Sequence, residues 1–484
     1  MKVSELISIL PEKEVKGDPE IEIAKIEYDS RLINPEDMFV AMIGSIQDGH
    51  EFIDHAIKEG ADAIVCQKDG DYDAKCVIKV PDARHALSLL AARFYNFPSR
   101  KLKVAGITGT NGKTTTVYMV KSIFDQRMKR SGLIGTIEYM AGSYQFKAFN
   151  TTPESLHLER LMSIMLQERL RNVIMEVSSH ALKTGRVRMI DFNVVALTNL
   201  TQDHLDFHGA MEEYREAKAL LFDKVKGKDK WAVLNMDDPN YDFFLARAES
   251  SYLAYSMENP KADVRIGQVE KVDDGFTFLL YTPLGDVEVH LKLNGRFNLN
   301  NALCAASVAL ASGVDPHTIK RGLEAMTFVP GRMEPVHLDK DYKVFIDYAH
   351  TPDALSHAMK SAKELADEKR LIAVFGCGGD RDKEKRPLMA KAVSEFADVV
   401  VLTTDNPRTE DPQSILADAE KGLNSSREAH VIGDRREAIA KALELAQTGD
   451  IVVIAGKGHE DYQIVGKDKM DFDDRVIVRE VTQT

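Results

Sequence analysis

The architecture of this chain is indicated most clearly by the stretch Val104-Ala105-Gly106-Ile107-Thr108-Gly109-Thr110-Asn111-Gly112-Lys113-Thr114-Thr115-Thr116. Its first residues are apolar and β-branched, as in a buried strand. Its glycines then permit a tight loop, and apolar residues at helical spacing follow from Val117 to Phe124. A glycine-rich loop that opens a helix points several backbone N–H groups and the positive end of the helix dipole at one spot. The stretch therefore predicts a phosphate-binding loop at the edge of a sheet.

Two side chains of this loop indicate a nucleotide triphosphate as its ligand. Lys113 is placed to reach the β- and γ-phosphates of ATP, and the hydroxyl of Thr114 is placed to hold Mg²⁺. The strict phosphate-loop spacing is not met, because Ile107 stands where the first glycine belongs. The alternative is a tight strand-to-helix turn with an incidental lysine. The position of Gly-Lys-Thr-Thr between a strand and a helix favours phosphate binding.

The same order of strand, polar loop and helix recurs along the chain. Short β-branched runs, each followed by polar or glycine-rich residues, occur at 173–177, 194–198, 344–347, 371–375, 399–402 and 451–454. Apolar strands alternating with helices predict an α/β fold with mostly parallel sheets that are buried on both faces. In such sheets ligands bind beyond the carboxyl ends of the strands. We therefore expect the functional side chains at those ends.

The length of the chain and the positions of its turn-forming residues predict three domains. The chain has 484 residues, and domains average roughly 150 residues. Turn-forming residues interrupt helical patterns at Phe97–Lys101 and at Val329–Arg332. These two linkers divide the chain into expected domains at 1–98, 99–330 and 331–484.

Composition excludes several classes of protein. The net charge of −13 argues against binding to nucleic acid, which requires a basic field. The four cysteines form no C-x-x-C pair, so reduced structural thiols in a reducing compartment are expected. Glu5 interrupts any signal peptide, and the most apolar run, 302–314, is too short to span a bilayer. We expect a cytoplasmic protein without membrane insertion.

Motifs spread over essentially the whole chain resemble those of the Mur ligases and the folylpolyglutamate synthetases. They are Asp29–Arg31, Gly109–Thr115, Glu176–His180, Asn199–Asp206, Glu216–Lys218, Gly295–Asn298, Gly331–Glu334, Asp347–Pro352 and Gly456–Glu460. The set is most similar to the Mur branch that adds the third peptide residue in peptidoglycan synthesis. The resemblance implies an N-terminal nucleotide-sugar domain, a central phosphate-loop ATPase domain and a C-terminal Rossmann-like domain that binds an amino acid.

The resemblance also implies a reaction. The D-glutamate γ-carboxylate of UDP-N-acetylmuramoyl-L-alanyl-D-glutamate attacks the γ-phosphorus of ATP, and an acyl phosphate forms. The amine of the incoming amino acid then displaces phosphate through a tetrahedral intermediate. Such chemistry depends mainly on positioning and charge neutralisation. We expect the enzyme to be a monomer, with Mg²⁺ as its cofactor.

For catalysis, the resemblance assigns Lys113 to the phosphates and Thr114, Glu176 and His204 to Mg²⁺. It makes Lys218 an N6-carboxylysine, a lysine carbamylated by CO₂ that also binds the metal. The alternatives are a helix-capping carboxylate for Glu176 and a structural histidine for His204, and their occurrence together with the phosphate loop favours the metal site. Composition alone makes Lys218 a solvated surface lysine.

The remaining nucleotide and sugar contacts also follow from the resemblance. The ATP-binding residues are Gly109, Thr110, Asn111, Gly112, Lys113, Thr114, Thr115, Asn298, Arg332 and Asp347. Those for the UDP-muramyl-dipeptide are Ser30, Asn150, Thr151, Thr152, Ser178 and Arg186. On their own, Arg332 and Asp347 would be a linker arginine and a strand-end carboxylate. The resemblance instead implies that ATP lies between two domains whose closure assembles the site.

The amino acid to be added is indicated by Asp405-Asn406-Pro407-Arg408, which resembles the motif of the diaminopimelate-adding branch. Meso-2,6-diaminopimelate is lysine with an additional carboxylate, and a guanidinium offers that group two parallel hydrogen bonds. A site built for this carboxylate rejects lysine, which would leave the arginine unpaired. The alternative is a β-turn with an exposed arginine. Further contacts implied by the resemblance are Arg381, Gly456 and Glu460.

Two kinds of alternative function remain. One is another ligase of the same superfamily that adds lysine or D-glutamate or forms folylpolyglutamate, against which Arg408 and the Asp29–Arg31 motif argue. The other is a phosphate-loop switch or motor protein, which would hydrolyse ATP without any amino acid. A ligase would release phosphate only when all its substrates are present.

Overall fold

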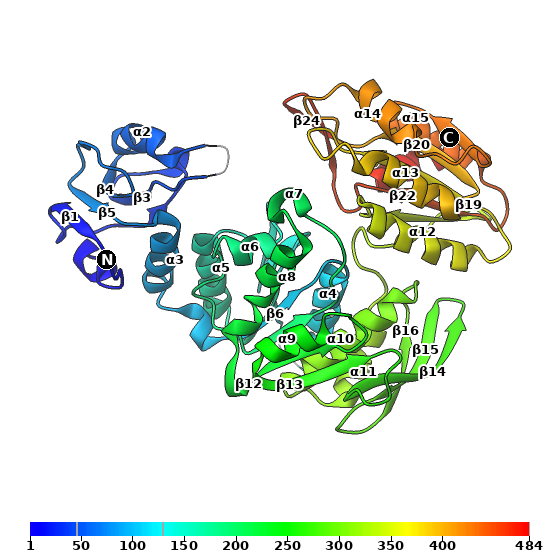
Figure 1. The fold of residues 1–484 in the computed structure, drawn as a ribbon, viewed down its shortest axis with the longest axis horizontal. Helices are drawn as coiled ribbons and strands as arrows, with labels where there is room; N and C mark the ends of the chain where they lie inside the picture. The colour runs from blue at the N-terminus through cyan, green and yellow to red at the C-terminus, as the bar shows by residue number, and fades with distance from the viewer. Residues whose placement is uncertain (45–46, 128–129, 484) are drawn as a thin grey trace.

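The computed structural model describes residues 1–44, 47–127 and 130–483. Three α/β domains follow one another along the molecule in chain order, each built on its own sheet (Figure 1). Most strand pairs in these sheets are parallel, so the predicted fold class is confirmed. In the described ranges no helix is both long and apolar enough to cross a membrane.

The N-terminal domain has a sheet of strand order β1-β5-β4-β3-β2. Its helices pack apolar residues such as Leu6 and Leu87 against the inner face of the sheet. Its elements are α1 Val3–Ile7, β1 Glu14–Gly17, β2 Ile26–Glu27, β3 Asp37–Val40, α2 Ile53–Lys58, β4 Ala61–Cys66, β5 Cys76–Lys79 and α3 Ala83–Phe94.

The middle domain has a sheet of strand order β16-β15-β14-β13-β12-β11-β6-β10-β7-β8-β9. Its elements are β6 Lys103–Thr108, α4 Lys113–Asp125, β7 Gly132–Ile134, β8 Glu138–Ala141, β9 Tyr144–Lys147, α5 Ser155–Gln167, β10 Asn172–Glu176, α6 Ser179–Lys183, β11 Val194–Leu197, α7 Leu205–His208, α8 Met211–Ala219, β12 Lys226–Asn235, α9 Tyr241–Arg247, β13 Glu249–Ser256, β14 Val264–Val272, β15 Gly275–Tyr281, β16 Val287–Leu291, α10 Phe297–Ala311 and α11 Pro316–Glu324.

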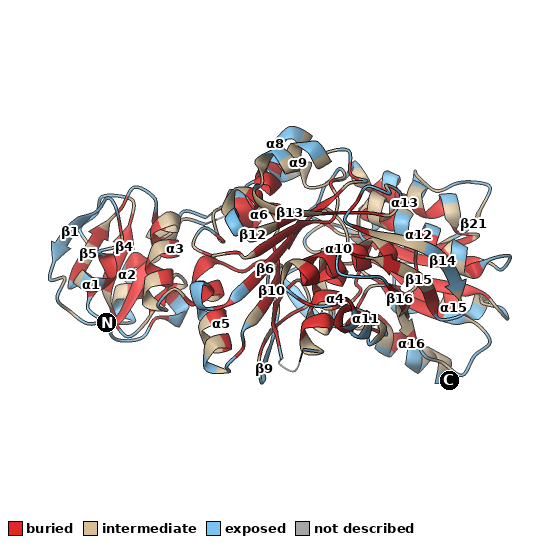
Figure 2. Cartoon of the chain, turned by 90° about the horizontal axis from the view of Figure 1, so that it is seen from below, coloured by how far each residue is buried: buried red, intermediate tan, exposed pale blue. Residues whose placement is uncertain are grey.

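Strand order in the middle domain brings the predicted polar residues together. β6 lies between β10 and β11 and is parallel to both, so the carboxyl ends of these strands adjoin. The strands are buried on both faces, with α4 and α10 packed on one side and α5 on the other (Figure 2). Because burial fixes the register of the strands, the loops that follow β6, β10 and β11 meet at one edge.

The C-terminal domain has a sheet of strand order β17-β18-β22-β19-β20-β21 and a separate hairpin, β23-β24. Its elements are β17 Glu334–Val336, β18 Lys343–Asp347, α12 Pro352–Ala366, β19 Leu371–Cys377, α13 Lys385–Phe396, β20 Val399–Thr404, α14 Pro412–Glu420, β21 Glu428–Val431, α15 Arg435–Leu445, β22 Ile451–Ala455, β23 Tyr462–Val465, β24 Asp468–Asp471 and α16 Asp474–Gln483. The four cysteines of the chain are free and buried, as the sequence predicted.

A buried ion pair ties α15 and α16 to the ends of two strands. The Arg435 guanidinium donates to both Asp474 oxygens at 2.8 and 2.7 Å, and to the carbonyls of Thr404 and Ala455. We expect Asp474→Ala to lower the free energy of unfolding by about 3–5 kcal/mol, because it leaves a buried cation unpaired. Denaturant unfolding measures this loss.

A matched control is Arg436→Ala. It removes the exposed Arg436–Glu480 pair between the same two helices, which should cost about 0–1 kcal/mol. Equal losses for the two variants would contradict the importance of burial.

Candidate active site

The phosphate loop between β6 and α4 requires its glycines. Gly109 has φ +148° and Gly112 has φ +83°, and both values favour glycine. A Cβ at Gly109 would lie 1.8 Å from Thr198 Oγ1, and one at Gly112 would lie 2.3 Å from Asn301 Oδ1. The backbone therefore approaches its neighbours closely at both positions, and the amides of Thr110 and Asn111 donate to the backbone and side chain of Asn199 at 2.9 Å each.

Two lysines converge on this loop. Lys113 Nζ donates to the carbonyls of Gly109 and Thr110 at 2.9 and 2.8 Å, and Lys218 Nζ donates to the same Gly109 carbonyl at 2.8 Å. Lys218 is 1% exposed, so its interpretation as a surface lysine is wrong. Burial, with a contribution from the charge of Lys113, holds the pKa of Lys218 well below its usual value. Burial also lowers the pKa of Lys113.

Oxygen ligands for a divalent cation gather beside the loop. Thr114 Oγ1 donates to Glu176 Oε2 at 2.9 Å, and Thr136 donates to both oxygens of the same carboxylate. A carboxylate and a hydroxyl are hard ligands of the kind that Mg²⁺ takes together with phosphate oxygens and water. The residues present therefore fit Mg²⁺, although no group of three or more His, Cys, Asp or Glu side chains forms a metal cluster within the described chain.

His204 lies on the loop after β11, next to Asp203. Its backbone has φ +53°, and its Nε2 is 3.4 Å from Asp203 Oδ2. Burial lowers the pKa of His204 to about 4, against the attraction of Asp203. The ring is therefore neutral at neutral pH and retains a nitrogen lone pair for a cation or a water molecule. Within the described chain no hydrogen bond joins it to Thr114 or Glu176.

The predicted dipeptide contacts form a connected group after β10. Thr152 Oγ1 donates to the Glu176 carbonyl at 2.9 Å and accepts from the Ser178 amide at 3.0 Å. Arg186 Nη1 donates to the Thr152 carbonyl at 3.0 Å. The Nε of Arg186 is buried, has no hydrogen-bond partner in the described chain and lies 3.7 Å from Glu154 Oε2.

Three more of the predicted sugar contacts lie around this group. Thr151 bonds to Thr136 at 3.1 Å, and the Asn150 carbonyl accepts from Tyr139 at 2.5 Å. Ser30 is buried in the N-terminal domain, and within the described chain no direct contact joins it to the others. The structure thus brings the middle-domain contacts together and leaves Ser30 across the domain boundary.

The C-terminal domain reaches the phosphate loop. Arg332 Nη2 donates to Thr114 Oγ1 at 3.3 Å. Asp353, at the start of α12, accepts from Asn111 Nδ2 at 2.6 Å and from Thr201 Oγ1 at 3.0 Å. Asp353 was missed by the sequence analysis, although it follows the Asp347–Pro352 motif directly. These contacts bring residues of both domains to the same loop.

Two predicted nucleotide contacts have structural roles here. Both oxygens of Asp347 accept backbone amides, from Met333 and Ala349, at 2.7 Å each. Burial raises the pKa of the Asp347 carboxyl. Asn298 opens α10 and accepts from Asn301, which touches Gly112. Thr115 is buried in the first turn of α4.

The predicted amino-acid contacts lie at the carboxyl ends of β19, β20 and β22. Arg408 has φ +53°, a value that is strained for a non-glycine residue and common at functional sites. Its Nη1 donates to the carbonyls of Gly379 and Asn406 at 2.8 and 3.3 Å. Among the residues that the structure describes, no carboxylate pairs with Arg408, and neither its Nε nor its Nη2 donates a hydrogen bond.

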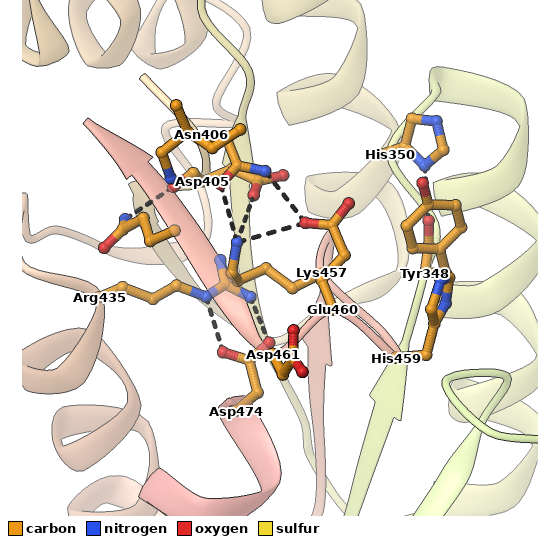
Figure 3. Close-up of polar contacts among 12 residues, drawn as sticks. Tyr348, His350, Asp405, Asn406, Arg435, Lys457, His459, Glu460, Asp461 and Asp474 are labelled. Carbon is orange, nitrogen blue, oxygen red and sulfur yellow. Dashed lines mark hydrogen bonds and ion pairs between the residues drawn. The ribbon is translucent and has the colours of Figure 1, made fainter. Parts of the chain in front are cut away.

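The other residues of the motif face the turn after β22. Asn406 Nδ2 donates to Glu460 Oε2 at 3.0 Å (Figure 3). Pro407 and Asp405 are buried, and a Cβ at Gly456 would lie 3.1 Å from Asp405 Oδ2. Arg381 is exposed and lies on the loop after β19, where its Cγ approaches Gly378. The structure thus groups Asp405, Asn406, Gly456 and Glu460, with Arg381 at the rim.

Comparison with known proteins agrees with this architecture. Three family models match: the Mur ligase family catalytic domain at residues 22–95, the Mur ligase middle domain at 107–309, and the Mur ligase glutamate ligase domain at 331–458. Curated proteins named UDP-N-acetylmuramoyl-L-alanyl-D-glutamate–2,6-diaminopimelate ligase are 44% identical in Geobacillus thermodenitrificans and 45% identical in Geobacillus kaustophilus. In each case 99% of both chains is covered.

Solved structures show the same relationship. One with that same ligase name is 34% identical, has a TM-score of 0.69 and covers 100% of this chain and 99% of its own. The UDP-N-acetylmuramoylalanyl-D-glutamyl-2,6-diaminopimelate–D-alanyl-D-alanyl ligase of Acinetobacter baumannii shares the fold, with 20% identity, a TM-score of 0.68 and 94% of each chain covered. With three matching family models and full-length relatives above 40% identity, the chain belongs to the Mur ligase family.

Proposed function

We propose that this chain is the ATP-dependent ligase that joins meso-2,6-diaminopimelate to the D-glutamate γ-carboxylate of UDP-N-acetylmuramoyl-L-alanyl-D-glutamate in peptidoglycan synthesis. The full-length relatives that carry this name support the proposal. The observation that carries the choice of amino acid is Arg408, a half-buried guanidinium that is held by two carbonyls and has no carboxylate partner in the described chain. The distal carboxylate of diaminopimelate is the partner that fits this fork.

The chain's own residues account for both halves of the reaction. Lys113 and the amides of the phosphate loop bind and orient the triphosphate, and Arg332 adds a second cation at Thr114. They offset the repulsion between the triphosphate and the attacking γ-carboxylate, which is the main barrier to forming the acyl phosphate. Arg408 and Glu460 hold the far end of the amino acid so that its other amine reaches the acyl phosphate.

Mg²⁺ belongs to this proposal as the cofactor. Thr114, Glu176, His204 and a carbamylated Lys218 would hold it, and when bound it supplies positive charge to the phosphate oxygens. Carbamylation requires a neutral amine, and burial favours that form of Lys218. Lys218 and Lys113 donate to the same Gly109 carbonyl, so the two side chains lie next to each other. At this position the two oxygens of a Lys218 carbamate could bind a metal ion.

The carbamate predicts a rescue experiment. We expect Lys218→Ala to reduce kcat about 100-fold or more, the scale on which removing one preorganised electrostatic group acts. Short carboxylic acids such as acetate should restore part of the activity by supplying the missing anion. Phosphate release with all substrates present measures both effects. Loss of activity without any rescue would count against the carbamate.

The proposal also covers the roles of the domains, the oligomeric state and the location of the enzyme. We propose domains at 1–98 for the nucleotide-sugar, 99–330 for ATP and 331–484 for the amino acid. We also propose a monomer that acts in the cytoplasm, where ATP and UDP-linked sugars are available.

An omission assay tests the function against its rivals. Phosphate release is measured with ATP, Mg²⁺ and UDP-muramyl-dipeptide, with diaminopimelate, with lysine, or with neither. The proposal expects release with diaminopimelate and little release otherwise. Release without an amino acid would instead indicate an ATPase switch, and equal release with lysine would indicate the lysine-adding branch.

A further inference from the structure

A fully buried lysine lies among the predicted amino-acid contacts. Lys457 is 0% exposed and follows β22. Its Nζ lies 3.0 Å from Asn406 Oδ1, 3.4 Å from Asp405 Oδ1 and 3.4 Å from Glu460 Oε2 (Figure 3). An ammonium group has three N–H donors and no acceptor. Because three acceptors surround it, Lys457 has no donor left for a ligand.

The turn that carries Lys457 is packed closely against its neighbours, and this packing fixes the position of the side chain. Gly456 has φ +115° and Gly458 has φ +53°. A Cβ at Gly458 would lie 2.6 Å from Tyr348 Cβ, and one at Gly456 would lie 3.1 Å from Asp405 Oδ2. Only glycine permits this close approach. The backbone is therefore packed against its neighbours on both sides of Lys457, and the ammonium is fixed between the two loops.

The two oxygens of the Glu460 carboxylate have different contacts. Its Oε2 accepts from Asn406 Nδ2 at 3.0 Å and pairs with Lys457. Its Oε1 accepts no hydrogen bond from any residue that the structure describes, and Figure 3 shows this oxygen directed away from Lys457. One oxygen is therefore held by Asn406 and Lys457, and the other remains able to accept a hydrogen bond.

We propose that Lys457 is a positioning residue for the incoming amino acid: it holds Glu460 so that one carboxylate oxygen receives the distal ammonium group. This deepens the proposed function and rests on it. Without the lysine, two carboxylates would face the same desolvated space with no cation between them. They would separate, and the Glu460 oxygen that receives the ammonium group would no longer be held in place.

A purely structural role is the competing explanation. The Arg435–Asp474 pair behind the same strand ends is structural, since among the described residues the Arg435 guanidinium donates its hydrogen bonds to Asp474 and to the carbonyls of Thr404 and Ala455. A lysine of that kind would lower stability and affect all substrates alike. A positioning lysine acts on the amino acid alone, so the KM values separate the two roles.

The test is Lys457→Met in the full-length enzyme, with KM measured for each substrate in turn. We expect the KM for the amino acid to rise about 30-fold or more, the lower range for truncating one member of a buried charge pair. The KM values for ATP and for UDP-muramyl-dipeptide should change less than about threefold. The matched control is Lys469→Met, which removes an exposed lysine that contacts the Tyr462 ring, as Lys457 also does, and should leave every KM unchanged.

A double-mutant cycle adds a readout that a structural role would not give. If Lys457 acts through Glu460, removing Lys457 should have little further effect once Glu460 has been changed. The amino-acid KM of the Lys457→Met/Glu460→Gln double variant should therefore be no more than about threefold above that of Glu460→Gln alone. Multiplicative effects, or equal rises in the KM for ATP, would overturn the inference. Should the methionine variant not fold, Lys457→Arg keeps the charge but cannot place a compact ammonium among the three oxygens. The same selective rise is then expected, and an unchanged amino-acid KM would overturn the inference.

The cycle is run with whichever of diaminopimelate and lysine the unmodified enzyme adds with the higher kcat/KM. Preference for lysine would refute the proposed function while the Lys457 cycle still gives its own result. Preference for diaminopimelate with an unselective Lys457→Met would refute the inference alone.

Discussion

Lys113→Ala should reduce kcat about 10³-fold or more, with stability little changed. The Lys113 ammonium lies on the phosphate loop, within 2.9 Å of the Gly109 carbonyl, and it is the cation best placed to offset charge on the transferred phosphoryl group. Electrostatic stabilisation of this kind is among the largest contributions to phosphoryl transfer. Initial rates of phosphate release at saturating substrates measure the loss.

The matched control for this variant lies on the same helix. Lys121→Ala removes a lysine of α4 that pairs with Asp125 at 2.5 Å, and this i,i+4 pair contributes only a few tenths of a kcal/mol. Its kcat should remain within about twofold of the unmodified enzyme. If Lys113→Ala retained full turnover, the loop would be a structural turn and the proposed phosphate site would be wrong.

Arg408→Ala should reduce kcat/KM for diaminopimelate by about 30- to 5,000-fold, equivalent to the roughly 2–5 kcal/mol lost when a buried charge pair is broken. The guanidinium is held by the carbonyls of Gly379 and Asn406, so its position is set before the substrate arrives. Lysine lacks the second carboxylate, and its low kcat/KM should change less than about tenfold. The preference for diaminopimelate should therefore fall sharply.

Two further variants sharpen this test. Arg408→Lys keeps the charge but loses the planar fork, so it should recover only part of the activity. Arg427→Ala removes an arginine that pairs with Asp398 away from the pocket and should leave the preference unchanged. A loss of kcat/KM that is the same for both amino acids would show that Arg408 supports the fold rather than the distal carboxylate.

Much of the fold could be predicted because buried strands appear in the sequence as short runs of apolar residues. The apolar runs at 173–177, 194–198 and 451–454 form β10, β11 and β22, each parallel to its neighbours. Their carboxyl ends carry the residues that the motifs indicated. The contact between Thr114 and Glu176 agrees with the expectation that the ends of neighbouring parallel strands meet, because β6 lies next to β10.

Other features could not be predicted from composition, because they depend on packing between distant segments. Lys218 lies on a helix with a polar sequence, and only the approach of α8 to the phosphate loop buries it. Thr136 has no motif of its own and becomes significant through its bonds to Glu176. Asp353 and Lys457 act across loops that adjoin only in the folded chain.

The mass of the product shows directly which amino acid the enzyme adds. The enzyme is incubated with ATP, Mg²⁺, UDP-N-acetylmuramoyl-L-alanyl-D-glutamate and equal concentrations of meso-diaminopimelate and lysine, and the UDP-linked product is analysed by mass spectrometry. We expect a UDP-muramyl-tripeptide that contains diaminopimelate, formed together with one phosphate per tripeptide. A product that contains lysine in similar amount, or phosphate release without any tripeptide, would contradict it.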